Sequence, residues 1–183
     1  RQVGRADYGL PQEAFVYCCF NNSAKIDAHT FGVWMEVLRR VEGSVLWLLE
    51  APALAQQNLK QHMEAQGLDP ERLVFAPIEV KAMHLARIAL ADLALDTFIC
   101  NAHTTATDAL YAGVPMVTKL GETFASRVGA SVVNACGLGQ LIAASDDTFI
   151  ELAVRMAQDA AWRAEVQSVM ARRLQAPLFD NLR

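Results

Sequence analysis

Residues 93–115 decide the fold: they read Leu93-Ala-Leu-Asp-Thr-Phe-Ile99 and then Cys100-Asn-Ala-His-Thr-Thr-Ala-Thr-Asp-Ala-Leu-Tyr-Ala-Gly-Val-Pro115. The apolar run predicts a buried strand over Leu93–Ile99, and the pattern after it predicts a helix over Thr105–Ala112 that ends at Gly113. A buried strand that leads straight into a helix is typical of a parallel α/β sheet. The first turn of such a helix offers free N–H groups and the positive end of the helix dipole, so we expect a phosphorylated ligand there.

The same alternation of strand and helix patterns extends over the rest of the chain. Further strands are expected over Ala14–Phe20, Ser44–Leu49, Leu73–Ala76 and Pro115–Thr118. Further helices are expected between Asp27 and Gly43 and over Leu54–Gln66, Lys81–Ala91, Ser126–Ala135, Phe149–Ala160 and Ala161–Leu174. Right-handed crossovers between such strands give an α/β fold with a doubly wound parallel sheet, Rossmann-like, whose ligands bind at the carboxyl ends of the strands.

The composition is that of one globular domain. The 183 residues are 53% hydrophobic and 20% charged, which excludes a disordered chain. The net charge of −4 argues against nucleic acid as a partner. No apolar run approaches about 18 residues, so no membrane-spanning helix is expected. The four cysteines form no CxxC pair, and we expect buried thiols in a reducing, cytoplasmic compartment and no metal site.

Asn22 and Lys25 stand in the turn after the first expected strand, Phe20-Asn-Asn-Ser-Ala-Lys-Ile-Asp27. Asn22 offers an amide and Lys25 a positive charge at the edge of the sheet where ligands bind. The alternative interpretation is a polar loop with a solvated lysine.

Lys81, His84 and Arg87 are spaced at i, i+3 and i+6 near the start of the helix after the third strand, so they share one face of it. An imidazole can stack on a base, a lysine can reach a ribose hydroxyl or a phosphate, and an arginine can hydrogen-bond a carbonyl edge. The alternative is an ordinary exposed helix face. Three basic groups near a helix start oppose the helix dipole, however, and this conflict favours function.

His103 and Thr104 precede the helix expected from Thr105, and Asp108 lies one turn into it. Threonine hydroxyls and N–H groups suit a phosphate, and the Asp108 carboxylate suits a ribose or sugar hydroxyl. Simple capping is the alternative, with Thr104 as the N-cap and Asp108 as an acid favoured by the dipole. Capping leaves His103 unexplained.

Signature motifs of other nucleotide enzymes and of hydrolases are absent from the sequence. No GxGxxG follows the first strand, and the chain contains neither GxxxxGK[ST] nor GxSxG. These absences argue against a nicotinamide-dependent dehydrogenase, a P-loop NTPase and an α/β-hydrolase.

From about Tyr8 to Phe179 the chain resembles the C-terminal catalytic lobe of the O-linked N-acetylglucosamine transferases and their SPINDLY relatives, which are GT-B glycosyltransferases that carry tetratricopeptide repeats. The stretches that carry the resemblance are Tyr8-Gly-Leu-Pro11, Phe20-Asn21, Lys25-Ile-Asp27, Ser44-Val-Leu-Trp-Leu-Leu49, His103-Thr-Thr105 with Asp108, Ala112-Gly113, Pro115-Met-Val-Thr118, Gly121-Glu-Thr123, Ala125-Ser-Arg127 and Pro177-Leu-Phe179. The chain differs from the family's usual sequence at Asn22 (usually Gln), Glu79-Val80 (usually Ala-Pro), and Ala102 and Ala106 (usually Gly).

The resemblance implies metal-independent, inverting transfer of a sugar, N-acetylglucosamine above all, from a UDP-sugar to Ser or Thr hydroxyls of proteins, without a cofactor. By motif position the resemblance places Lys25 and Thr105 at the diphosphate, with His103 and Thr104 beside it and Asn22 at the phosphate or sugar. It places His84 on the uracil, Arg87 at the uracil edge and the backbone at Glu79 against the base. Lys81 and Asp108 would lie at the ribose. Lys25 and His103 are the residues expected to take part in catalysis.

A GT-B enzyme works in a cleft between two lobes, and the resemblance implies that this chain is the donor-binding one. Residues 1–13 would be a lead-in linker from an upstream lobe, and residues 14–183 would be the Rossmann-like donor lobe without the family's C-terminal crossing helix. The acceptor protein, the N-terminal catalytic lobe and the tetratricopeptide repeats would be its partners, so we expect the chain alone to be inactive. Two alternatives stay open: a GT-B-derived binding or scaffold module that has lost catalysis, and a relative that uses GDP-fucose.

Overall fold

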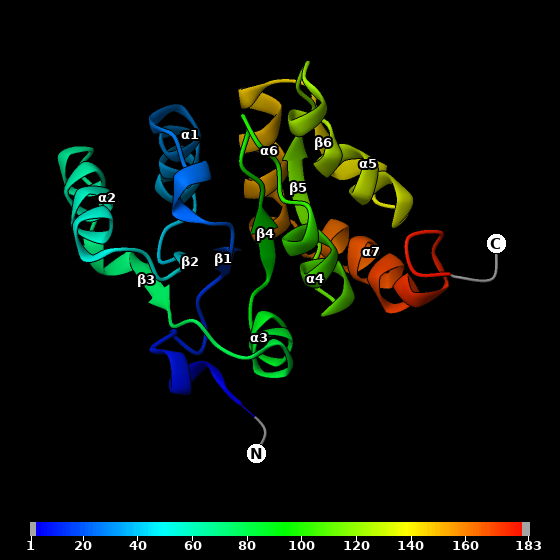
Figure 1. The fold of residues 1–183 in the computed structure, drawn as a ribbon, viewed down its shortest axis with the longest axis horizontal. Helices are drawn as coiled ribbons and strands as arrows, with labels where there is room; N and C mark the ends of the chain where they lie inside the picture. Colours follow the sequence, from blue (N-terminus) through cyan, green and yellow to red (C-terminus); the bar gives the residue numbers. More distant parts are fainter. Residues whose placement is uncertain (1–2, 181–183) are drawn as a thin grey trace.

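The computed structural model describes residues 3–180, and its six-stranded sheet is parallel at every strand pair (Figure 1). The strands are β1 Val16–Cys19, β2 Val45–Leu49, β3 Leu73–Ala76, β4 Leu93–Leu95, β5 Met116–Lys119 and β6 Ile142–Ala143. Their order across the sheet is β3-β2-β1-β4-β5-β6. The order reverses between β1 and β4, which confirms the predicted doubly wound sheet. Residues 1–2 and 181–183, the outer ends of the expected linker and lobe, lie outside the described residues.

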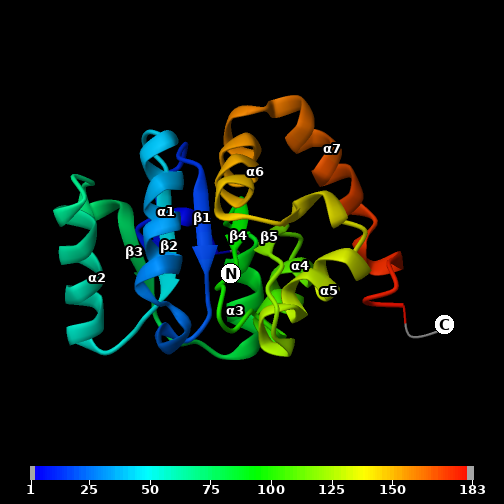
Figure 2. The ribbon, with the colours of Figure 1, turned by 90° about the horizontal axis from the view of Figure 1, so that it is seen from above.

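The α-helices described between residues 3 and 180 are α1 Ala28–Arg40, α2 Ala53–Ala65, α3 Lys81–Ile88, α4 Thr104–Tyr111, α5 Val128–Ala135, α6 Asp146–Gln158 and α7 Ala160–Ala171. Helix α1 packs against α6, whereas α3 packs against α4 and α4 against α5. Right-handed crossovers place these two sets on opposite faces of the sheet, and in Figure 2 α3, α4 and α5 lie together on the side away from α6. No helix in this part of the chain is both long and apolar enough to span a membrane.

The strands are covered by helices on both faces, so they carry apolar side chains at successive positions. All four residues of β1 are buried, and Tyr17 lies between Leu46 of β2 and Leu93 of β4 in the register. The indole rings of Trp34 and Trp47 are fully buried in the same core. This core fixes the positions of the strand ends, and with them the turns that carry the site.

The strand predicted over Leu93–Ile99 is wrong in length, because β4 has only three residues. Asp96 follows it, and its carboxylate accepts hydrogen bonds from the backbone N–H groups of Thr97 and Ala102. These bonds bend the chain into a turn where the apolar pattern predicts an extended strand. Strand β6 is absent from the prediction because two residues are too few to show a period.

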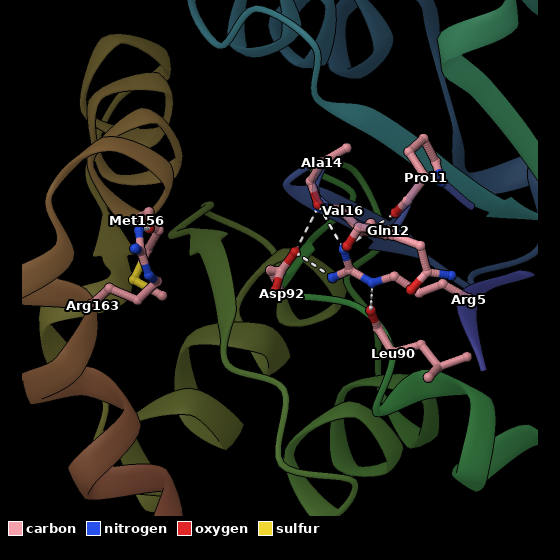
Figure 3. Close-up of polar contacts among 9 residues, drawn as sticks. All are labelled: Arg5, Pro11, Gln12, Ala14, Val16, Leu90, Asp92, Met156 and Arg163. Atoms are coloured by element: carbon pink, nitrogen blue, oxygen red, sulfur yellow. Dashed lines mark hydrogen bonds and ion pairs between the residues drawn. The ribbon is translucent and has the colours of Figure 1, made fainter. Parts of the chain in front are cut away.

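Hydrogen bonds and an ion pair of Arg5 hold the segment before β1 against the domain (Figure 3). Its guanidinium donates to the carbonyl oxygens of Ala14 at 2.8 Å and Leu90 at 3.1 Å, and to Oδ2 of Asp92 at 2.9 Å. The same carboxylate oxygen accepts from the backbone N–H of Val16 at 2.7 Å. The described part of the expected linker therefore packs closely against the domain.

Candidate functional site

The candidate site lies at the carboxyl edge of the sheet, beside the point between β1 and β4 where the strand order reverses. In doubly wound folds this is where ligands bind. The turn after β1 carries Asn22 and Lys25, and the turn after β4 leads through His103 to Thr104 and Thr105 at the start of α4. These two turns come from distant parts of the sequence and contact each other directly.

Lys25 is tied to the turn that precedes α4. Its Nζ donates to the carbonyl oxygen of Asn101 at 3.0 Å, and the hydroxyl of Thr105 donates to Oδ1 of Asn21 at 2.5 Å. Within residues 3–180, Lys25 forms no ion pair at contact distance, and the backbone N–H groups of Thr104 and Thr105 have no acceptor. One lysine charge and two free N–H groups thus lie at the same edge, and such a combination is typical of phosphate-binding sites.

Lys81 on α3 and Asp108 on α4 form an ion pair, with Nζ 2.5 Å from both carboxylate oxygens. The side chain of Asp108 is 13% exposed and that of Lys81 is 57% exposed. The structure therefore brings together the two residues expected at a ribose, and here each compensates the charge of the other. A ribose hydroxyl fits such a pair, because it can accept from the ammonium group and donate to the carboxylate.

Arg87 is fully buried. Its guanidinium lies 3.2 Å from Oε2 of Glu79 and donates to the carbonyl oxygen of Pro77. The hydroxyl of Tyr8 donates to the same Glu79 carboxylate at 3.1 Å. With its side chain only 1% exposed, Arg87 does not reach a ligand edge in this conformation, in contrast to the role expected for it. It instead supports the neighbouring His84.

His84 is held as a neutral imidazole. Its Nδ1 accepts from Nη2 of Arg87 at 2.9 Å, so the ring proton lies on Nε2. Burial and the neighbouring guanidinium lower the pKa of His84. The ring of Phe20 meets it edge-on, with 5.2 Å between the ring centres. A neutral, half-buried ring supported in this way suits stacking on a flat base.

Asn22 and His103 lie at the exposed margin of the site. Oδ1 of Asn22 accepts from the backbone N–H of Ala24 at 2.9 Å, which caps the short turn that holds Lys25. The N-cap of α4 is His103, and its ring has no hydrogen-bond partner among the described residues. The alternative that Thr104 is the N-cap is therefore wrong, because Thr104 is already the first residue of α4 and caps nothing.

One hollow adjoins this cradle of Lys25 and the α4 start, and a second lies beside Pro77 and Met83, near the start of α3. The first, of about 640 Å³, is lined by residues 22–24, 49–52 and Ile78, and the second, of about 530 Å³, includes Tyr8 and Glu79 in its wall. Both volumes fall in the range of small-molecule sites.

Comparison with known proteins assigns the family. The family model described as glycosyl transferase family 41 matches residues 2–183. The chain belongs to glycosyl transferase family 41. The probable UDP-N-acetylglucosamine–peptide N-acetylglucosaminyltransferase SEC of Arabidopsis thaliana is 41% identical over 181 residues, which cover 98% of this chain and 18% of the relative. The UDP-N-acetylglucosamine–peptide N-acetylglucosaminyltransferase of Caenorhabditis elegans is 41% identical over 179 residues, which cover 97% of this chain and 16% of that protein.

A solved structure shows the same architecture. The structure of a mutant O-GlcNAc transferase from Thermobaculum terrenum matches with a TM-score of 0.85 and 25% sequence identity, over 93% of this chain and 35% of that chain. The doubly wound sheet thus has the fold of one lobe of a GT-B glycosyltransferase, which confirms the fold expected from the sequence. This family 41 chain spans less than a fifth of the length of the two curated relatives.

The candidate site is supported by buried residues that sequence reasoning did not single out. Asp96, Thr97 and Asn101 belong to the turn before α4 and are fully buried. The sequence feature that could have revealed them is the presence of Asp96 and Thr97 inside the otherwise apolar run Leu93–Ile99. Within residues 3–180, no three His, Cys, Asp or Glu side chains come together as a metal-binding group.

Proposed function

We propose that this chain is the donor-binding lobe of an inverting protein O-glycosyltransferase, which transfers N-acetylglucosamine from UDP-N-acetylglucosamine to Ser or Thr hydroxyls. The observation that carries the proposal is the bond from Lys25 to the turn that leads into α4, at the point of strand-order reversal in a family 41 lobe. The names of the two curated relatives, which are peptide N-acetylglucosaminyltransferases, support the donor and the class of acceptor.

In the proposed reaction the acceptor hydroxyl oxygen forms a bond to the anomeric carbon while the bond from that carbon to UDP breaks. The UDP leaves with an additional negative charge on its terminal phosphate, and the acceptor proton goes to a base outside this chain. Lys25 and the N–H groups of Thr104 and Thr105 would stabilise the leaving phosphate, with His103 and Asn22 beside it. One oriented donor of this kind is worth about 3–4 kcal/mol of barrier, so the proposal needs neither a metal nor a cofactor.

The other site residues would recognise the nucleoside. The neutral ring of His84 would stack on uracil, and the backbone at Glu79 would contact the edge of the base. The pair of Lys81 and Asp108 would hold the ribose hydroxyls. Arg87 would act through the ring of His84, because its own guanidinium is enclosed by protein.

Exposed apolar side chains around the cradle support a second lobe as partner. Large apolar residues are exposed in the segments that follow β3, β4 and β5, namely Ile78, Val80, Ile99, Leu120 and Phe124. In the whole protein they would face the N-terminal lobe, with the acceptor held between the lobes and tetratricopeptide repeats further upstream. The chain alone would bind UDP weakly and transfer no sugar.

A binding module without catalysis is the second candidate. It is favoured by one observation: Lys81 and Arg87 are paired with the carboxylates of Asp108 and Glu79, so their charges are already compensated within the protein. A GDP-sugar donor is the remaining alternative.

Titration calorimetry with UDP and GDP separates these functions. We expect UDP to bind, GDP to bind at least about tenfold more weakly, and Lys25→Met to lower UDP affinity at least about tenfold, since one charge-assisted contact is worth roughly 1.5–3 kcal/mol. Lys60→Met is the matched control, because Lys60 lies on α2 in an exposed pair with Glu71. If neither nucleotide gives binding heat, the binding module without catalysis is favoured. If GDP binds more tightly than UDP, a GDP-sugar is favoured as the donor.

A further inference from the structure

Asp96 is a fully buried carboxylate directly after β4, beneath the candidate site. Its Oδ1 accepts from the backbone N–H groups of Thr97 at 2.9 Å and Ala102 at 2.7 Å, and its Oδ2 accepts from the hydroxyl of Thr118 at 2.7 Å. The two backbone bonds close residues 96–102 into the turn that leads into α4. The shape of this turn therefore depends on one side chain.

Two asparagines extend the arrangement to neighbouring elements. Nδ2 of Asn101 donates to the carbonyl oxygen of Thr97 at 2.7 Å, and its Oδ1 accepts from the backbone N–H of Gly129 on α5 at 3.0 Å. Nδ2 of Asn21 donates to the hydroxyl of Thr97 at 2.9 Å. The turn is thus tied to α5 on one side and to the end of β1 on the other.

The buried cluster of Asp96, Thr97, Asn101 and Asn21 also hydrogen-bonds to residues of the candidate site. The carbonyl oxygen of Asn101 accepts from Lys25, and Oδ1 of Asn21 accepts from the hydroxyl of Thr105. A lysine and a helix start from different turns are therefore fixed relative to each other by buried hydrogen bonds. Buried partners of this kind determine how well a site is organised before its ligand arrives.

The carboxylate is retained at an energetic cost. Burial raises the pKa of Asp96 to about 7, although its three hydrogen bonds and the charge of Lys25 lower it. The titratable groups that interact with it are Lys25, from the turn after β1, and Cys19 of β1. From β5 and α5 it meets the uncharged Thr118 and Gly129. A costly buried charge next to an anion-binding edge points to a role in the site.

We propose that Asp96 is a positioning residue, which holds the turn so that Lys25 and the start of α4 meet the diphosphate, and that its carboxyl takes up a proton when the diphosphate binds. The inference rests on the proposed nucleotide-sugar function. The diphosphate brings negative charge close to the carboxylate and engages Lys25, and both effects favour the protonated form. The hydroxyl oxygen of Thr118 can then accept a hydrogen bond from the protonated carboxyl, since a hydroxyl is both donor and acceptor.

Calorimetric titration of the chain with UDP at pH 7, in two buffers of different ionisation enthalpy, gives both the affinity and the number of protons exchanged. The wild type is expected to take up a fraction of a proton per UDP at Asp96, because the pKa of this carboxyl lies near that pH and part of the population is ionised before UDP binds. Asp96→Ala is expected to lower the affinity at least about tenfold. Asp96→Asn should restore most of the affinity, because its amide oxygen accepts the same N–H groups, but it should remove the proton uptake.

A ligand-free measurement covers the case in which Asp96→Ala does not fold. The amide NMR signals of Thr97 and Ala102 should titrate with a midpoint near 7 in the wild type, with a higher midpoint in Thr118→Val, and not at all in Asp96→Asn. Equal UDP affinity of Asp96→Ala and wild type, or an unchanged proton count in Asp96→Asn, overturns the inference and leaves UDP binding intact. If UDP does not bind but the amide signals still titrate as expected, the proposed function is overturned, whereas the role of Asp96 in holding the turn is kept.

Discussion

The guanidinium of Arg87 donates to Nδ1 of His84 from both Nε, at 3.1 Å, and Nη2, at 2.9 Å. Because a guanidinium has no acceptor, the imidazole must be neutral and carry its proton on Nε2. Glu79 compensates the charge of Arg87, and Tyr8 donates to Glu79. A chain of four side chains from three segments thus sets the protonation of the ring that we propose to stack on uracil.

Removing Arg87 together with its counter-charge should raise the pKa of His84. In the double variant Arg87→Met, Glu79→Gln, burial of the ring persists but the second cause of its lowered pKa, the guanidinium, is gone. The imidazole ¹H NMR signals of His84, followed from pH 4 to 9, measure the effect. Glu79→Gln alone keeps the bond from Arg87 and should leave the pKa low. An equal pKa in wild type and double variant would contradict the account.

Sequence reasoning predicted that most of the candidate residues lie at one edge of the sheet, but not how these residues pair. The turn positions of Lys25 and Thr105 follow from strand ends and a helix start, which are local patterns. The burial of Arg87 does not, because the spacing of Lys81, His84 and Arg87 predicts a shared helix face and says nothing about what covers it. Here the Glu79 carboxylate covers it, which only tertiary packing decides.

Lys81 and Asp108 should contribute to nucleotide binding much more than to stability. The ammonium group is more than half exposed, and exposed ion pairs contribute about 0–1 kcal/mol to folding. We expect Lys81→Met to change the free energy of unfolding in urea by less than about 1 kcal/mol and to lower UDP affinity about tenfold, the loss of one charge-assisted hydrogen bond. Asp108→Asn should behave in the same way. A large loss of stability with unchanged UDP affinity would show that the pair is structural.

The raised pKa of Asp96 makes stability fall with rising pH over a defined window. Below about pH 4 the carboxyl is protonated in both the unfolded and the folded state. Between that pH and about 7 it stays protonated only in the folded protein, so folding loses stability as pH rises, by an amount on the order of 4 kcal/mol across the window. Above about pH 7 the contribution is constant.

Urea denaturation of wild type and Asp96→Asn at a series of pH values isolates this contribution. Asp27 and Glu36 have lowered pKa values and act in the opposite direction, so only the difference between the two proteins is diagnostic. That difference should change between pH 4 and 7 and stay level from 7 to 9. A difference that is constant over the whole range would mean that Asp96 titrates normally.

Arg5 should contribute more to stability than its place in an expected linker indicates. Its guanidinium donates to several carbonyl oxygens and to Asp92 (Figure 3). Arg5→Ala leaves the carboxylate of Asp92 without that partner, and we expect a loss of about 3 kcal/mol in urea denaturation. Arg39→Ala is the matched control, because its pair with Glu36 is exposed and should cost less than about 1 kcal/mol. Equal losses would mean that the segment before β1 is not fastened in solution.

The fold was easier to predict than its turns, because strands are marked by local apolar patterns and turns depend on tertiary contacts. Buried apolar runs such as Ser44–Leu49 mark strands covered on both faces, so the doubly wound sheet follows from them. The run Leu93–Ile99 has the same character, yet Asp96 within it takes its partners from Thr118 and Ala102. Thr118 comes from the next strand of the sheet, 22 residues further along the chain, and the apolar pattern of Leu93–Ile99 does not reveal that contact.

Gly129 on α5 should be intolerant of even one methyl group. A Cβ at this position would lie 2.1 Å from Oδ2 of Asp96 and 2.6 Å from Oγ1 of Thr118, and both groups are held by buried hydrogen bonds. We expect Gly129→Ala to destabilise the protein by about 1–3 kcal/mol, and to lower UDP affinity because the turn before α4 would be displaced.

Gly32 on α1 provides the matched comparison, since it is also a helical glycine but a Cβ there meets no atom within 4 Å. Gly32→Ala should stabilise the protein by about 0.5–1 kcal/mol, the usual gain from replacing glycine inside a helix. Urea denaturation of both variants should therefore give changes of opposite sign. If Gly129→Ala were also stabilising, the close packing of α5 against Asp96 would not exist in solution, and the buried support of the Lys25 and α4 cradle would have to come from elsewhere.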